Sequence, residues 1–179
     1  MSVRNKRGKI TVLETVLYPM LAALTFGLQL VMELLPNVHL TGMMIMLFAA
    51  VFRGRGLFPL YLYVFLIGAR WGFGPSWVPY LYVWLPLWGA VMLLPRGLPP
   101  RALAFIYPAI GFCHGLLFGT LYAPLQALLF GLNFHQTLAW IAAGLSFDLI
   151  HALGNLGACC LVLPLSVFLK RLLKKSRHS

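Results

Sequence analysis

The basic side chains of this 179-residue chain stand between long apolar runs, and they recur after every second run. Of the 14 lysines and arginines, 13 lie before the first apolar run, after the second or fourth, or at and beyond the end of the sixth. Arg70, between the third and fourth runs, is the exception. Because short cytoplasmic loops retain Lys and Arg, this alternation predicts six membrane spans with both termini on the cytoplasmic side.

The apolar runs predict an all-α integral membrane protein in which residues 1–179 form one six-helix domain. The predicted spans are 11–35, 39–52, 57–69, 78–94, 102–130 and 136–173. A composition of 61% hydrophobic and 9% charged residues lies far outside soluble usage. The second and third spans are short for lipid-facing helices, so we expect them to tilt or to pack against longer neighbours.

The net charge of +11 is explained by the same alternation. The cations cap apolar runs and form no stripe or arm, which predicts contact with the bilayer and its anionic lipids, and no nucleic-acid partner. The sequence has no Walker-type glycine loop, so the chain is not expected to hydrolyse nucleotide by that route. Its three cysteines lie inside apolar runs as small buried residues without metal-ligand spacing, and we expect no metal site.

Small residues at spacings of four mark two of the predicted helices. In the fifth span they predict close approach of another helix, and Pro124 is expected to bend the end of that span. These small residues are Gly111, Gly115, Gly119, Ala123 and Ala127. In the first span Ala22, Ala23 and Gly27 form a smaller patch, for which internal packing and docking of a partner protein are both open.

Asp148 is the acidic residue that the alternation places near the middle of the bilayer. A bare charge there costs at least about 2.5–3.5 kcal/mol, so the carboxylate must be paired, protonated or exposed to a wet cavity. His151 and Asn155 lie on the same helical face, and His114 in the fifth span falls at a similar depth. These four residues are either a ligand-binding or proton-relay cluster or a hydrogen-bonded clasp between helices. For Asn155 the clasp is the favoured interpretation.

Aromatic residues gather at the predicted outer end of the third and fourth spans. Four of the five tryptophans lie between positions 71 and 88, next to Arg70. Interfacial Trp and Tyr commonly form an anchoring belt, but a belt would be spread over more helices. The concentration indicates an aromatic-walled pocket for a flat or bulky polar ligand.

Two stretches carry a resemblance to a known family, together with the six-span plan and the 20.0 kDa size. They are residues 35–39 (Leu-Pro-Asn-Val-His), which open a short second helix, and residues 144–155 in the last helix. With these features the chain resembles the substrate-binding S component of an energy-coupling factor (ECF) vitamin transporter. The family usually has Ala-x-x-x-Ala in its first helix, where this chain has Ala23-x-x-x-Gly27.

The resemblance implies a multi-pass protein of the bacterial plasma membrane that captures a vitamin at its outer face. Such a protein associates with a transmembrane coupling subunit and two ATPase subunits, and it topples in the membrane to release its substrate inside. ATP and Mg are then handled by the partner subunits, so this chain is expected to be no enzyme and to hold no cofactor. Ala22, Ala23 and Gly27 are the residues implied for partner docking.

The resemblance also implies which residues bind the substrate. They are Asn37, His39, Arg70, Trp71, Trp77, Tyr80, Trp84, Gln126 and Trp140. A large pocket with many aromatic residues and few fixed charges favours a corrinoid such as cobalamin. Thiamine-like compounds, pyridoxine, pantothenate and queuosine precursors are the alternatives.

Two other classes of protein are alternatives to a transporter subunit, namely an intramembrane enzyme and a small channel or assembly protein. An intramembrane enzyme would use Asp148, His114 and His151 for acid-base chemistry, but the sequence has no paired nucleophile or His-Glu-x-x-His motif. A channel requires a regular polar stripe along its helices, and none is seen in the sequence.

Overall fold

The computed structural model describes residues 11–35 and 38–176, and this part of the chain is all-helical without a strand. The elements in chain order are α1 (Val12–Met32), α2 (Thr41–Phe52), the 3-10 turn η1 (Arg53–Gly56), α3 (Leu57–Trp71), the 3-10 turn η2 (Val78–Leu81), α4 (Leu85–Leu93), α5 (Pro100–Leu116), α6 (Phe118–Phe130), α7 (Phe134–Cys159) and α8 (Val162–Ser176). Four apolar helical segments are long enough to cross a membrane, namely Val12–Met32, Thr41–Trp71, Pro100–Phe130 and Phe134–Cys159.

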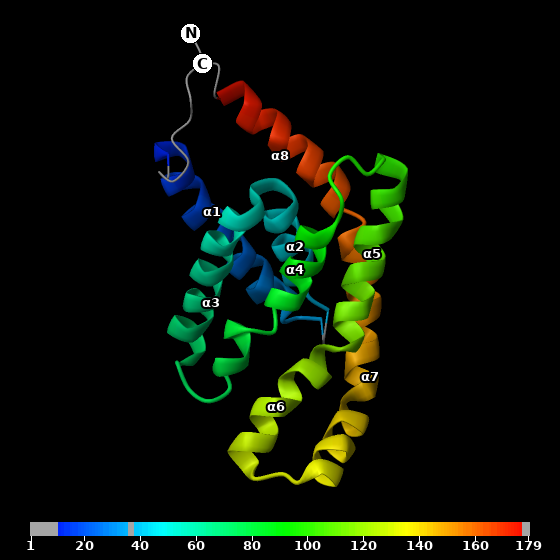
Figure 1. The fold of residues 1–179 in the computed structure, drawn as a ribbon. Coiled ribbons are helices and arrows are strands. Elements are labelled where there is room, and N and C mark those ends of the chain that lie inside the picture. Colours follow the sequence, from blue (N-terminus) through cyan, green and yellow to red (C-terminus); the bar gives the residue numbers. More distant parts are fainter. Residues whose placement is uncertain (1–10, 36–37, 177–179) are drawn as a thin grey trace.

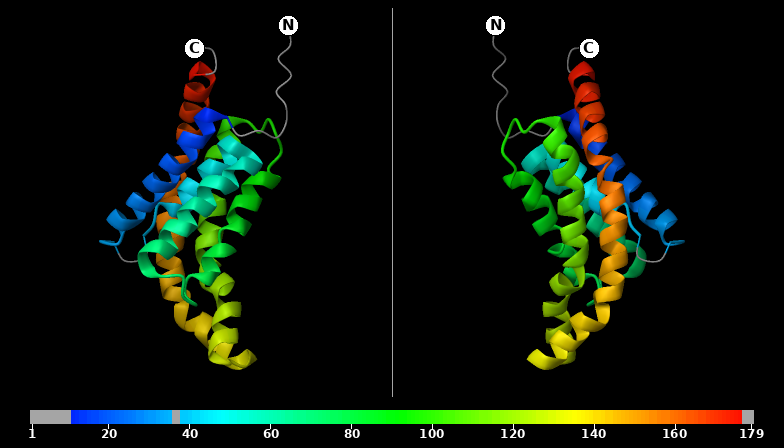
Figure 2. Two further views of the ribbon diagram at one scale, coloured as in Figure 1. Left: turned by 90° about the vertical axis from the view of Figure 1, so that its left-hand side faces the viewer. Right: turned by 90° about the vertical axis from the view of Figure 1, so that its right-hand side faces the viewer.

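The chain runs back and forth between two ends of the molecule, with α5 and α6 running in one direction and α7 and α8 in the other (Figure 1). One end holds the start of α1, η1, the α4–α5 loop and the end of α8, and it carries every described basic residue except Arg70; we call it the basic end. The opposite end, called the aromatic end, holds the α3–η2 and α6–α7 loops. Figure 2 shows that α6 and the start of α7 extend beyond the other helices at the aromatic end.

The segment Thr41–Trp71 is folded back on itself. The Thr41 hydroxyl lies 3.4 Å from the Tyr63 hydroxyl, whereas a continuous helix would separate these residues by about 33 Å. The reversal occurs at Arg53, which has φ 56° and ψ −128°. The two arms of 12 and 15 residues are shorter than the ~30 Å hydrocarbon core. As expected for a short span, α2 packs against longer neighbours, and its residues from Thr41 to Ala50 are all buried.

Three of the predicted spans contain interruptions of the helix in the structure. The fourth divides into η2 and α4, and Pro86 lies at the start of α4, where its missing N–H costs little. The fifth breaks at Leu117, whereas Pro124 lies inside α6. The sixth breaks between α7 and α8, where Pro164 has no N–H to donate to the Cys160 carbonyl.

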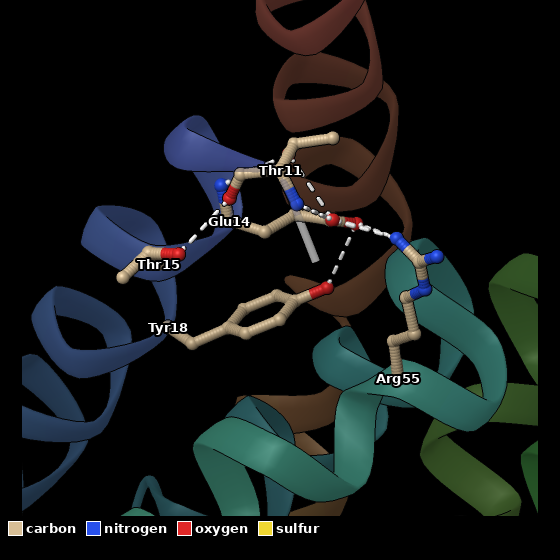
Figure 3. Close-up of polar contacts among 5 residues, drawn as sticks. All are labelled: Thr11, Glu14, Thr15, Tyr18 and Arg55. Atoms are coloured by element: carbon tan, nitrogen blue, oxygen red, sulfur yellow. Dashed lines mark hydrogen bonds and ion pairs between the residues drawn. The ribbon is translucent and has the colours of Figure 1, made fainter. Parts of the chain in front are cut away.

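At the basic end, Glu14 joins the start of α1 to η1 (Figure 3). Both carboxylate oxygens accept from Arg55 Nη1 at 2.6 Å, and Oε1 also accepts from the Tyr18 hydroxyl at 3.1 Å. Thr11 and Glu14 form a capping box, in which Thr11 Oγ1 accepts from the Glu14 N–H at 3.2 Å. A buried carboxylate thus fixes the angle between α1 and the α2–α3 hairpin.

The small residues of the fifth span pack against α7, which confirms the predicted close helix approach. A Cβ added at Gly111 would collide with Cys159, and one added at Gly119 would lie 2.6 Å from an Asp148 oxygen. At Gly115 it would lie 2.5 Å from Ala152 Cα, which is backbone. The glycines therefore allow α5, the start of α6 and α7 to approach at backbone distance.

Candidate ligand-binding site

The loop of residues 72–77 folds back on α3 and positions the tryptophan-rich segment. Gly72, with φ +96°, ends α3 and donates its N–H to the Gly68 carbonyl at 2.8 Å. Trp77 Nε1 donates to the Val64 carbonyl at 2.8 Å, and the Phe73 and Trp77 rings meet edge to face at 5.1 Å. The Phe73 ring occupies the space that a Cβ on Gly68 would fill, so a larger residue at that position would displace the ring.

A cavity of about 330 Å³ opens at the aromatic end between α1, α3, η2 and α6. Its walls include four aromatic side chains and three polar ones. They are Trp71, Trp77, Tyr80 and Tyr122, with Gln29, Glu33 and Ser76. This volume is in the range of small-molecule sites, and a few polar groups among apolar walls are typical of such sites. The predicted aromatic-walled pocket is therefore present in the structure, and Trp71, Trp77 and Tyr80 line it.

The sequence analysis missed the contributions of α1 and α6 to this cavity. Gln29 and Glu33 lie four apart and share a face at the end of α1. The side-chain amide oxygen Oε1 of Gln29 accepts from the Thr41 hydroxyl at 2.9 Å, which holds α1 against α2. The Tyr122 hydroxyl donates to the Ser76 carbonyl at 2.5 Å and so ties α6 to the 72–77 loop. The spacing of four between Gln29 and Glu33 was the signal in the sequence that could have indicated their shared face. Tyr122 had no such signal, because it lies beyond the break at Leu117.

Other predicted binding residues lie away from the cavity walls. Arg70 is exposed, and its guanidinium carbon lies 5.4 Å from the centre of the Trp71 ring. Gln126 lies on α6 and Trp140 on α7, and neither lines the cavity. Asn37 lies outside the described residues.

Behind the cavity, aromatic and histidine rings pack around Phe118 at the start of α6. His151 stacks on Phe118 at 4.8 Å, and Trp84 lies 5.6 Å from the same ring. His114 stacks on Trp84 at 5.6 Å, and its Nε2 lies 2.8 Å from the Val83 carbonyl. His39 meets His151 edge to face at 5.5 Å. These rings reach the cavity wall through Tyr122, which lies 6.3 Å from Phe118.

Several buried polar atoms of this ring cluster have no hydrogen-bond partner in the described part of the chain. They are His39 Nδ1, Trp84 Nε1, His114 Nδ1 and His151 Nε2. Burial lowers the pKa of His39. An unpaired buried polar group costs about 1–3 kcal/mol, and none of these four residues lines the 330 Å³ cavity.

Asp148 joins α7 to the start of α6. Both carboxylate oxygens accept from the Gly119 N–H at 3.1 Å, close to the break at Leu117. The N–H groups of a first helical turn lack intrahelical partners and favour a negative charge, so Asp148 acts as a cap from a neighbouring helix. Its hydrogen bonds go to Gly119 and not to His114 or His151. Asn155 is buried, and neither of its amide atoms has a hydrogen-bond partner among the described residues, so the expected clasp is not seen at this residue.

The patch predicted for partner docking is divided between the core and the surface. Ala22 is 1% exposed and packs inside the protein, so its assignment to a docking surface was wrong. Ala23 is exposed, and a Cβ added at Gly27 would meet no atom within 4 Å. Met20 and Leu24 are exposed on the same helix. Ala23 and Gly27 therefore lie on an open apolar surface.

Within residues 11–35 and 38–176, no three His, Cys, Asp or Glu side chains are grouped so as to hold a metal ion. Cys159 is buried as expected, but Cys113 and Cys160 are exposed on apolar helices. Comparison with known proteins gave no match to any protein family, curated protein or solved structure. A proposal for the function must therefore rest on the arrangement of the residues in the site.

Proposed function

We propose that the chain is a membrane-embedded binding protein for a small vitamin or vitamin precursor, acting as the S component of an ECF-type importer. The cavity at the aromatic end is the observation that carries the proposal, because aromatic walls, a carboxylate and an amide converge there within about 330 Å³. The importer assignment rests on the resemblance of residues 35–39 and 144–155 to that family. Capture of the substrate, docking of a coupling subunit and toppling belong to the proposal.

The composition of the cavity favours a particular class of ligand. Flat rings stack on tryptophan and tyrosine, and the faces of these rings attract cations. Glu33 adds a negative charge to the wall, and Gln29 adds an amide. We therefore expect an aromatic heterocycle with a positive charge or several hydrogen-bond donors, such as a thiamine-like compound or pyridoxine. The acidic pantothenate is disfavoured.

The volume of the cavity at the aromatic end argues against a corrinoid, the ligand favoured by the number of aromatic residues in the sequence. Drug-sized ligands occupy sites of roughly 300–1,000 Å³, and this cavity lies at the lower end of that range. Cobalamin, with its macrocycle and nucleotide loop, is much larger than such ligands. The alternative of another vitamin or precursor is thus preferred to cobalamin.

An intramembrane enzyme is the less favoured function. Asp148 is bonded to the Gly119 N–H, and His114 Nε2 is matched to the Val83 carbonyl. Neither residue forms a hydrogen bond to the other or to His151, so each of the two is used in a structural contact between helices.

The proposal is tested by identifying what the purified protein binds. Mass spectrometry and an absorption spectrum of the co-purified ligand come first, followed by titration with thiamine, pyridoxine, pantothenate and cobalamin. We expect one-to-one binding of a small heterocycle, weakened by Glu33→Gln if the ligand is cationic. A protein that binds only cobalamin would overturn the ligand class. Failure to co-purify with any ATPase module from its own cell would overturn the importer role.

A further inference from the structure

A second cavity, of about 320 Å³, lies at the basic end, far from the proposed vitamin site. It is formed by the end of α2, the α4–α5 loop, the first half of α5 and α8. Three cationic side chains line it, namely Arg53, Arg96 and Lys170. Its remaining walls include the apolar side chains of Val91, Leu94 and Leu103.

No acidic side chain of this chain is available to balance these cations. The sequence contains three acidic residues. Glu14 is bonded to Arg55, Glu33 lines the cavity at the opposite end, and Asp148 caps α6. The cavity therefore concentrates positive charge.

Arg53 is held in position by contacts of its side chain and of its backbone to α4. Its Nη2 donates to the Met92 carbonyl at 2.8 Å, and its own carbonyl lies 3.4 Å from Trp88 Nε1. Its Nε is buried and has no partner among the described residues. Arg53 is also the one non-glycine residue with positive φ between residues 11 and 35 or 38 and 176. Sparsely populated backbone at a non-glycine residue is typical of functional sites.

We propose that this cavity binds the phosphate group of an anionic phospholipid. A guanidinium with free donors recognises phosphate oxygens, and the two exposed cations add charge attraction. Val91, Leu94 and Leu103 continue the cavity with apolar surface suited to the first part of the acyl chains. Basic pockets between membrane helices on the cytoplasmic side bind anionic headgroups in this way.

The test uses the full-length protein, delipidated in neutral detergent and titrated with phosphatidylglycerol, phosphatidylcholine and inorganic phosphate. The variant Arg96→Gln/Lys170→Gln removes two cavity cations and leaves the structural contact of Arg53 intact. The control Arg101→Gln/Lys174→Gln removes the same charge from exposed residues of the same end that do not line the cavity. Thermal unfolding of both variants checks that they are folded.

We expect phosphatidylglycerol to bind more tightly than phosphatidylcholine, and the cavity variant to weaken it by about tenfold or more. The control is expected to weaken it by about threefold or less. Binding of inorganic phosphate that is lost in the cavity variant would support the phosphate site but assign it to a soluble anion. Equal losses in the two variants, or no preference for phosphatidylglycerol, would overturn the proposal, because the attraction would then be general to the basic end.

Discussion

The packing of α5 against α7 gives a prediction that can be worked from the structure. In Gly115→Ala, the new Cβ would lie 2.5 Å from Ala152 Cα and 2.7 Å from Ala152 N. Carbon atoms in contact are about 3.5–4.0 Å apart, so the helices must separate by about 1 Å. Overpacking of this kind costs about 1–3 kcal/mol, whereas alanine in place of glycine stabilises a helix by about 1 kcal/mol.

Gly144→Ala is the matched control, because Gly144 lies inside α7 and a Cβ there meets no atom within 4 Å. This variant has the stabilisation that alanine gives a helix, without the steric clash with a neighbouring helix. We therefore expect Gly115→Ala to be less stable than Gly144→Ala by about 1–3 kcal/mol, which is roughly 3–10 °C in unfolding temperature for a chain of this size. Tryptophan fluorescence during heating in detergent micelles measures the difference. If Gly115→Ala unfolds at the same temperature as Gly144→Ala or at a higher one, the proposed backbone contact between α5 and α7 is refuted.

Two further predictions concern polar side chains. Asp148→Ala removes the cap and is expected to lower the free energy of unfolding by about 0.5–2 kcal/mol. Asp148→Asn keeps one acceptor oxygen for the Gly119 N–H, so its free energy of unfolding should fall by less. Equal decreases for the two variants in thermal unfolding would contradict the capping role. Burial holds the pKa of His39 below its ordinary 6.5, so the unfolded chain binds a proton first as pH falls. The unfolding temperature should therefore fall as pH drops below about 6.5, and His39→Gln should reduce that slope; an unchanged slope would show that His39 does not contribute.

Much of the helical plan could be predicted because charge and hydropathy act locally. The alternation of cations with apolar runs gave the helix order, and the spacing of Gly111, Gly115 and Gly119 gave the face that meets another helix. The breaks at Leu117 and between α7 and α8 were not predicted. The break at Leu117 lies beside a tertiary contact, the Asp148 carboxylate accepting from Gly119, which leaves no periodic signal in the sequence. The break between α7 and α8 has a local signal in Pro164.

The candidate site was predicted only in part, because the sequence shows local clusters of residues but not contacts between distant segments. Trp71, Trp77 and Tyr80 lie close together in sequence, so their concentration was visible. Tyr122 and Glu33 come from distant segments that only the fold brings to the cavity. Arg70 was selected as an exception to the charge pattern, yet its guanidinium packs beside the Trp71 ring and does not line the cavity.

The location of ligand binding tests the central proposal most directly. Trp71 lines the cavity and is 47% exposed, so Trp71→Ala removes a wall with little effect on the core. Trp140→Ala is the same chemical change on α7, away from the cavity. The affinities of both variants and of the unaltered protein are measured by fluorescence titration with the vitamin that co-purifies or binds best. We predict that Trp71→Ala weakens binding by about tenfold and that Trp140→Ala leaves it within about twofold. Loss of binding in Trp140→Ala with Trp71→Ala unaffected would contradict the proposed site.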